Sequence, residues 1–128
     1  MTSSTAPEAL IKSYIDAYNR FDIDGMCALL TPAIRFEHYN NAELSAEASG
    51  LQSFRALAET GAALFAEREQ RVTAVRIDGD QAVVEIAFHG KLAVDIPGGP
   101  SAGTVLTLNG TSEFTFAAGA ISHIIDRG

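Results

Sequence analysis

The sequence has little of several residue types that cross-link proteins or direct them to membranes. It contains one cysteine, Cys27, and no tryptophan. A single cysteine cannot form a disulfide within the chain, and we expect Cys27 to be a buried apolar side chain. No apolar run approaches the ~20 residues of a membrane-spanning helix, and the first residues lack the pattern of a signal peptide. These absences predict a cytoplasmic protein.

Basic residues are also scarce. The chain has 9 Lys and Arg against 16 Asp and Glu, which gives a formal net charge of −7. A basic surface is what binds the phosphates of DNA and RNA, and the same surface attracts anionic lipids. The densest basic run, formed by Arg68, Arg71 and Arg76, is interrupted by acidic residues. The composition therefore argues against nucleic-acid and membrane partners.

Motifs for metals, phosphates and hydrolytic nucleophiles are absent. The three histidines are far apart in the sequence, and no close pairing such as His-x-x-x-His occurs. Gly98-Gly99 lies between prolines and does not lead into a helical pattern, so it does not fit a phosphate-binding loop. No G-x-S-x-G nucleophile motif is present. We therefore expect neither a metal nor any other cofactor.

What the sequence does contain is typical of a folded globular chain. Hydrophobic residues make up 47% of it and charged residues 20%. A chain of 128 residues fits one domain and is long enough to bury a core. We predict a single domain over residues 1–128, with residues 1–6 as a flexible N-terminus.

Helical periodicity dominates the first half. Apolar residues recur at three- and four-residue spacing after Pro7, a residue that is favourable in the first turn of a helix. This stripe consists of Leu10, Ile11, Tyr14, Tyr18 and Phe21. We predict a second helix over 23–30, a strand over 34–39, a polar loop over 40–49 and a third helix that begins at Gly50.

The second half alternates between apolar and polar residues and predicts strands over 69–77, 81–96, 102–116 and 120–126. Two of these exceed the usual strand length of about 3–10 residues. Gly90 and Gly110 lie within them, where glycine often marks a bulge or bend. The pattern favours an α+β fold: a cone-shaped, strongly curved antiparallel (mixed) sheet with three helices from the N-terminal half on its concave face.

This order of elements resembles the nuclear transport factor two-like superfamily, and within it the SnoaL-like and ketosteroid-isomerase-like branch. The resemblance rests on YIDAYNRFDIDGMCALLTPAIRFEH, GLQSFRAL and GTSEFTFAAGAISHIID. It implies a cystatin-like α+β barrel with a pocket between helices and sheet, and commonly a homodimer formed through the outer sheet face. The superfamily includes isomerases, polyketide cyclases, dehydratases and proteins without catalysis, so the resemblance is specific for fold rather than function.

His38 is the first candidate for chemistry in such a pocket. It shares a strand face with Ile34 and Phe36, so alternation turns it inward. The resemblance places it where ketosteroid isomerases have their aspartate base, and an imidazole can transfer a proton at neutral pH. The alternative is a histidine that makes a purely structural hydrogen bond.

The resemblance also singles out Tyr14, as a donor to an enolate oxygen, and Ser112, which replaces the second, acidic donor of the isomerases. Asp126 ends the last strand and could orient His38 as its carboxylate partner. The alternatives are a core tyrosine and a strand-end surface acid. We predict that substrate contacts come from Tyr18, Phe36, Phe54, Ser112, Phe114 and Phe116.

We expect the remaining polar residues of the strands to face outward. Glu85 and His89 alternate with apolar neighbours, and His123 shares a predicted face with Ile121 and Ile125. The outer face of the predicted homodimer would include uncharged, β-prone side chains, namely Val105, Thr107, Thr111 and Thr115.

Two functions remain open at this point. One is a cofactor-independent isomerase, cyclase or dehydratase that acts on a hydrophobic steroid- or polyketide-like substrate through general acid–base chemistry. The other is a non-catalytic module of the same fold that binds a hydrophobic ligand or forms a dimeric scaffold.

Overall fold

The computed structural model describes residues 6–128, and residues 1–5, most of the expected flexible N-terminus, lie outside the described residues. The helices are α1 (Ala6–Asn19), α2 (Ile23–Cys27) and α3 (Leu51–Ala63). The strands are β1 (Leu30–Asn40), β2 (Glu43–Ser49), β3 (Phe65–Asp78), β4 (Gln81–Leu92), β5 (Val105–Ala117) and β6 (Ala120–Arg127). In this part of the chain, no helix has the length and apolar character needed to cross a bilayer.

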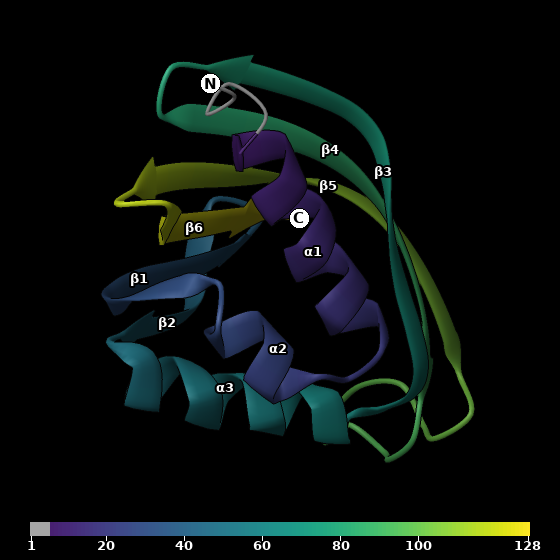
Figure 1. The fold of residues 1–128 in the computed structure, drawn as a ribbon. Helices are drawn as coiled ribbons and strands as arrows, with labels where there is room; N and C mark the ends of the chain where they lie inside the picture. Colours follow the sequence, from purple (N-terminus) through teal and green to yellow (C-terminus); the bar gives the residue numbers. More distant parts are fainter. Residues whose placement is uncertain (1–5) are drawn as a thin grey trace.

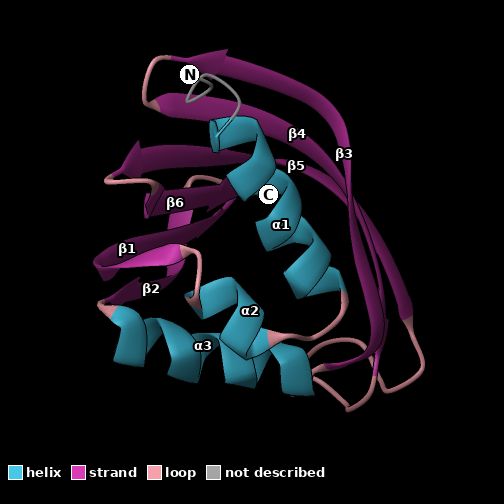
Figure 2. Cartoon of the chain, in the orientation of Figure 1, coloured by secondary structure: helices cyan, strands magenta, loops and turns pink. Residues whose placement is uncertain are grey.

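Within residues 6–128, six strands form one mixed sheet in the order β2-β1-β6-β5-β4-β3. Strands β1 and β6 pair in parallel, whereas every other neighbouring pair is antiparallel. Figure 1 shows β3, β4 and β5 bending along their length around α1. In Figure 2 the helices lie on the inner side of this bend, which confirms the predicted α+β class.

The apolar stripe of α1 packs against the inner side of the sheet. Ile11 and Tyr14 of the predicted stripe are 3% and 6% exposed, and Ile15, which the stripe did not include, is also buried. Helix α2 follows after a short turn. Asp22 caps its N-terminus, because the Asp22 side chain accepts a hydrogen bond from the backbone N–H of Gly25 at 2.9 Å. The two helices therefore form one wall of the interior.

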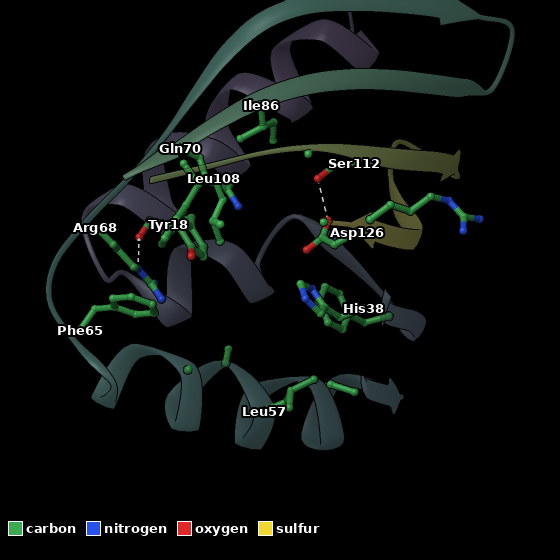
Figure 3. Close-up of a pocket in the computed structure, with 18 of the residues that line it drawn as sticks. Tyr18, His38, Leu57, Phe65, Arg68, Gln70, Ile86, Leu108, Ser112 and Asp126 are labelled. Carbon is green, nitrogen blue, oxygen red and sulfur yellow. Dashed lines mark hydrogen bonds between the residues drawn. The ribbon is translucent and has the colours of Figure 1, made fainter. Parts of the chain in front are cut away.

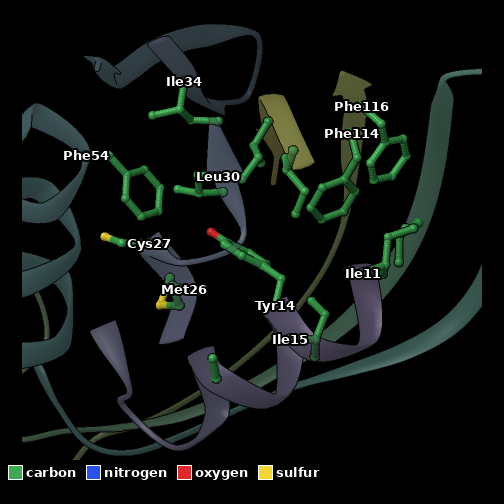
Figure 4. Close-up of a cluster of buried hydrophobic side chains, with 14 of the residues drawn as sticks. Ile11, Tyr14, Ile15, Met26, Cys27, Leu30, Ile34, Phe54, Phe114 and Phe116 are labelled. Carbon is green, nitrogen blue, oxygen red and sulfur yellow. The ribbon is translucent and has the colours of Figure 1, made fainter. Parts of the chain in front are cut away.

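The core lies between α1 and the strands β1, β4, β5 and β6. Figure 4 shows its side chains meeting from α1, α2, α3 and the sheet. Burial of a large apolar side chain contributes about 1.5–3 kcal/mol, so this cluster also holds the strands in register. The largest fully buried side chains are Phe114, Ile34, Leu92, Ile121, Ile124 and Val84.

Two predicted boundaries around β1 were wrong. The second helix ends at Cys27 rather than at residue 30, because Leu30 already pairs with Ile121 of β6. The polar loop predicted over 40–49 contains β2, which pairs with β1. Strand β2 lies at the sheet edge and is exposed except around Ala48, so it lacks the apolar alternation that identifies inner strands.

The boundaries of the second-half strands also moved. Strand β3 begins at Phe65 rather than at residue 69, β4 ends at Leu92 rather than 96, and β5 begins at Val105 rather than 102. Polar residues fill 67–71, and the apolar alternation there was too weak to predict the first part of β3.

The sequence indicated a bulge or a bend at Gly90 and Gly110, and neither glycine forms a bulge in the β4–β5 ladder. The β4–β5 ladder runs without a shift from Gln81 opposite Thr115 to Lys91 opposite Val105. The register shifts instead within β3, between positions 72 and 74, and at the β5–β6 pair, between 115 and 116. The glycines permit close approach: a Cβ on Gly110 would lie 2.5 Å from the Arg127 carbonyl oxygen, and one on Gly90 2.8 Å from the Phe65 ring.

A glycine pair tests this explanation. We expect Gly110→Ala to destabilise the protein by about 1–3 kcal/mol, because the added methyl group meets backbone that cannot easily move. Gly61→Ala in α3 is the matched control, because nothing lies within 4 Å of its Cβ position. We expect it to stabilise by about 0.5–1 kcal/mol through helix propensity. Urea unfolding measures both, and a Gly110→Ala variant as stable as wild type contradicts the steric explanation.

Candidate functional site

A cavity of about 490 Å³ lies between the helices and the inner face of the sheet. Its walls are mostly apolar, and Figure 3 shows side chains from α1, α3 and the strands directed into it. This size and character are typical of sites for small organic molecules. The apolar lining includes Phe36, Phe54, Leu57, Phe65 and Ile86.

Three polar side chains form a row across neighbouring strands in this cavity. His38 of β1 is opposite Asp126 of β6, and Asp126 is opposite Ser112 of β5. Residues opposite each other on paired strands project to the same face, so all three point inward. The Ser112 hydroxyl donates a hydrogen bond to Asp126 Oδ1 at 2.6 Å, drawn as a dashed line in Figure 3. Sequence alternation had predicted the inward orientation of His38 and Ser112 from their own strands.

Asp126 is the carboxyl group of this row, and its environment favours the neutral form. Burial raises the pKa of Asp126, and the Ser112 hydrogen bond and the charge of His38 offset this only in part. The side chain is partly exposed, but its exposed surface faces the cavity rather than bulk water. A carboxyl group with a raised pKa binds a proton more readily than an exposed aspartate does, which is the direction that acid–base chemistry requires.

His38 lines the cavity and is half-buried. Figure 3 shows its ring next to the Asp126 carboxyl group, with Leu57 of α3 on the other side. The imidazole is therefore placed to exchange protons with a bound molecule. The sequence predicted that Asp126 orients His38. The two residues lie directly opposite each other on β1 and β6, which is the placement that such a role requires.

Tyr14 and Tyr18 reach the cavity from successive turns of α1. Burial raises the pKa of both phenols, that of Tyr14 well above its ordinary value, so each remains a hydrogen-bond donor at neutral pH. The Tyr14 ring packs edge-on against Phe114, with 5.8 Å between centroids. Because Tyr14 lines the cavity, its phenol can donate a hydrogen bond to a bound molecule.

The four predicted phenylalanine contacts divide into two groups. Phe36 and Phe54 line the cavity and pack edge-on, with 5.8 Å between their ring centroids. Phe114 and Phe116 lie in the core, only 1% and 9% exposed, and are not part of the cavity wall. They lie on the inward face, as alternation predicts, but α1 covers that end of β5 and leaves no space for a ligand.

Two polar residues of the cavity were missed by the sequence analysis. Arg68 and Gln70 of β3 line the cavity, and Arg68 is only 7% exposed. They belong to the charged run at 67–71, which resembles a solvated surface, and the predicted strand began one residue after Arg68. Simple alternation from Phe65 would place 68 and 70 on the opposite face, and a register shift between Phe65 and Glu67 turns both into the cavity.

The other histidines and Glu85 lie outside the cavity. Glu85 and His89 are exposed and do not line it, as expected for the outer face of β4. His123 also faces outward, where its Nε2 lies 2.8 Å from Glu37 Oε2. The prediction that Ile121 shares this face was wrong, because the register shift between β5 and β6 turns Ile121 into the core.

With this geometry established, comparison with known proteins identifies the family. A SnoaL-like domain model matches residues 11–124, so the chain belongs to the SnoaL-like domain family. The fold prediction is thereby confirmed, including the relation to ketosteroid-isomerase-like and cystatin-like structures. No curated protein shows significant similarity to the chain.

Solved structures show the same fold at low sequence identity. A proposed polyketide cyclase from Xanthomonas campestris pv. campestris is 22% identical with a TM-score of 0.85, over 97% of this chain and 90% of that one. A proposed SnoaL-like polyketide cyclase from Jannaschia sp. CCS1 is 19% identical with a TM-score of 0.81, over 95% and 84%. A ketosteroid-isomerase-like protein from Catenulispora acidiphila, in complex with trimethylamine, is 13% identical with a TM-score of 0.76, over 91% and 82%.

The raised pKa of Asp126 makes a prediction about stability. The folded protein binds the Asp126 proton more tightly than the unfolded chain does. The contribution of this proton to the free energy of unfolding is therefore fully present below about pH 3.9, the pKa of an unfolded aspartate. It is lost as the pH rises through the pKa of the folded state. We expect Asp126→Asn to raise the free energy of unfolding at neutral pH, with the gain shrinking in acid. Asp78→Asn, at the exposed end of β3, controls for net charge. Urea unfolding across pH measures this, and an Asp126→Asn variant no more stable than Asp78→Asn at neutral pH contradicts it.

Proposed function

We propose that the protein is a cofactor-independent enzyme that moves a proton on a hydrophobic, steroid- or polyketide-like substrate, as isomerases, cyclases and dehydratases do. The observation that carries this proposal is Asp126, a carboxyl group with a raised pKa inside an apolar cavity, between His38 and Ser112. A titratable group with a shifted pKa in a concave apolar site is the usual starting point for a catalytic hypothesis.

The geometry supports a proton transfer next to a carbonyl group. Asp126 accepts a proton from the carbon adjacent to the carbonyl, which leaves an enolate, and later returns it to a second position. The Ser112 hydrogen bond holds the carboxyl group in place during both steps. His38, its neighbour across the strands, exchanges the proton with the substrate or with Asp126.

Tyr14 supplies the donor for the enolate oxygen in this proposal. Its hydroxyl is preorganised by packing against Phe114 and remains protonated at neutral pH. A donor fixed in an apolar site stabilises developing negative charge more than one in water does. Tyr18, one turn along α1, lies on the same wall of the cavity and contacts the apolar body of the substrate.

The relatives are consistent with this reaction class, because two of the similar structures carry names of proposed polyketide cyclases. The relative in complex with trimethylamine instead supports a second candidate, a pocket that binds a small molecule without converting it. The two functions differ in one measurable respect: only an enzyme changes the bound molecule.

Deuterium exchange tests the enzyme proposal. In D₂O we expect wild type to accelerate exchange at the carbon between or beside the carbonyls of a cyclic ketone or a polyketide-like diketone. We expect Asp126→Asn and His38→Ala to reduce the rate by about 10²–10⁴-fold, the range typical of a lost acid–base group.

His89→Ala is the matched control, since His89 is exposed and lies outside the cavity. Nuclear magnetic resonance follows the exchange, and native mass spectrometry shows whether a ligand is retained. Rates for Asp126→Asn and His38→Ala equal to wild type would exclude the acid–base roles. A ligand retained and released unchanged would favour the binding module.

We also propose that the protein forms a homodimer through the outer sheet face. In Figure 2 no helix of the described residues covers this face, and Val105 is 52% exposed there. Thr107 lies beside it on β5 and is also exposed. Uncharged, β-prone side chains on an uncovered sheet are typical of surfaces that associate.

Sedimentation velocity at micromolar concentration tests the dimer. We expect wild type to sediment as a dimer and Thr107→Glu to shift it toward the monomer, because two like charges would meet across a symmetric interface. Glu67→Gln, on the edge strand β3, is the control for a changed surface charge. A wild-type monomer would rule out the proposed interface.

A further inference from the structure

The cavity has a second polar region, away from the row formed by His38, Asp126 and Ser112. Arg68 and Gln70 stand two residues apart on β3 and share its inner face, so both line the cavity from the same strand. Figure 3 shows them at one end of the cavity, with Asp126 and His38 at the other. The proposed acid–base chemistry uses neither residue.

Arg68 is buried without a counter-ion. It is 7% exposed, and no carboxylate within residues 6–128 lies within 4.0 Å of its guanidinium. Buried charges in proteins are normally paired, because loss of hydration is costly unless an opposite charge compensates it. An arginine keeps its charge in this environment, so the compensation has to come from elsewhere.

The guanidinium is nevertheless held in a fixed orientation. Its Nε donates to the Tyr18 carbonyl oxygen at 3.1 Å. The central carbon of the guanidinium, Cζ, lies 3.7 Å from the centroid of the Tyr18 ring and 4.4 Å from the centroid of the Phe21 ring. These contacts engage Nε and stack the group against two rings, whereas Nη2 has no hydrogen-bond partner among the described residues. A group fixed in this way loses little entropy when it binds a ligand.

Two buried atoms at this end have no hydrogen-bond partner in the described part of the chain, namely Nη2 of Arg68 and Oε1 of Gln70. The Gln70 backbone is held on both sides by Asn19, whose side chain accepts from its N–H at 2.7 Å and donates to its carbonyl oxygen at 3.0 Å. The backbone of β3 is therefore fixed at Gln70, and disorder of the strand does not explain why these two side-chain atoms lack partners. Each unpartnered buried polar group costs free energy until something satisfies it.

We propose that Arg68 and Gln70 bind an anionic oxygen group of the ligand, such as a carboxylate, so that the substrate is an amphipathic acid rather than a neutral hydrocarbon-like molecule. The guanidinium pairs with the carboxylate, and the Gln70 amide, which has both a donor and an acceptor, binds a second oxygen beside it. The apolar body fills the middle of the cavity, and the opposite end of the molecule meets Asp126. This inference rests on the proposed function and extends it. The proposed function concerns the reacting end of the substrate, and the inference says that the other end carries an anionic group.

Binding of a matched pair of probes tests the proposal without requiring catalysis. Naphthoate and naphthamide have the same two-ring body, but only naphthoate is charged at neutral pH. We expect wild type to bind naphthoate about tenfold or more tightly than naphthamide in calorimetric titration. We expect Arg68→Met to bind both probes with similar affinity, because it keeps the side-chain length but not the charge.

Arg71→Met is the matched control, since Arg71 lies on the same strand with a 73% exposed side chain and is expected to keep the wild-type preference. Naphthamide binding by Arg68→Met shows that the cavity is intact. Wild type without a preference for naphthoate, or an unchanged preference in Arg68→Met, would overturn the proposal. Should Arg68→Met fail to fold, Arg68→Lys replaces it: the loss of the planar guanidinium is expected to weaken the preference severalfold, and an unchanged preference contradicts the proposal.

The result is separable from the acid–base proposal. Asp126→Asn should lose proton exchange but keep the preference for naphthoate, because Asp126 lies at the other end of the cavity. An Asp126→Asn variant that loses this preference would contradict the separation of the two ends. Loss of the preference in Arg68→Met, with proton exchange of a neutral diketone retained, would support the carboxylate site independently.

Discussion

The parallel pairing of β1 with β6 is the constraint on which the site depends. The two strands are separated by most of the chain, yet this pairing places Phe36 opposite Ile124 and His38 opposite Asp126. The apolar pairs Leu30–Ile121 and Phe36–Ile124 help to hold the register, because Ile121 and Ile124 are almost fully buried. A slip of one residue would turn every side chain of the strand to the other face and would carry His38 out of the cavity.

Much of the architecture follows from local pattern. The helical spacing of Ile11, Tyr14 and Tyr18 predicted α1 and its buried face, and strand alternation predicted that His38 and Ser112 face inward. Local pattern assigns a residue to a face, but it does not say which strand lies next to it. The hydrogen bond between Ser112 and Asp126 depends on a pairing that the sequence alone did not specify.

The missed features share a physical origin. Strand β2 and the first part of β3 are polar, because one is an exposed edge and the other presents Arg68 and Gln70 to the cavity. Polar residues on the inner face of a strand weaken the apolar alternation from which strands are predicted. The same property that makes Arg68 a functional candidate therefore concealed it: a charged side chain in a charged run resembles solvent-exposed surface until the fold is known.

Asp126 and Arg68 have opposite charges and line the same cavity, yet they form no ion pair with each other in the described structure. A direct pair would satisfy both groups and would lower the pKa of the aspartate, which would then be a weaker base. Their separation leaves the carboxyl group with a raised pKa and the guanidinium without a counter-ion. Both conditions cost stability, and the apolar core around Phe114 and Ile34 offsets that cost at a distance from the cavity. The interior therefore combines a packed apolar core with a cavity that holds polar groups at both ends, an arrangement that suits a ligand with an apolar body and polar ends.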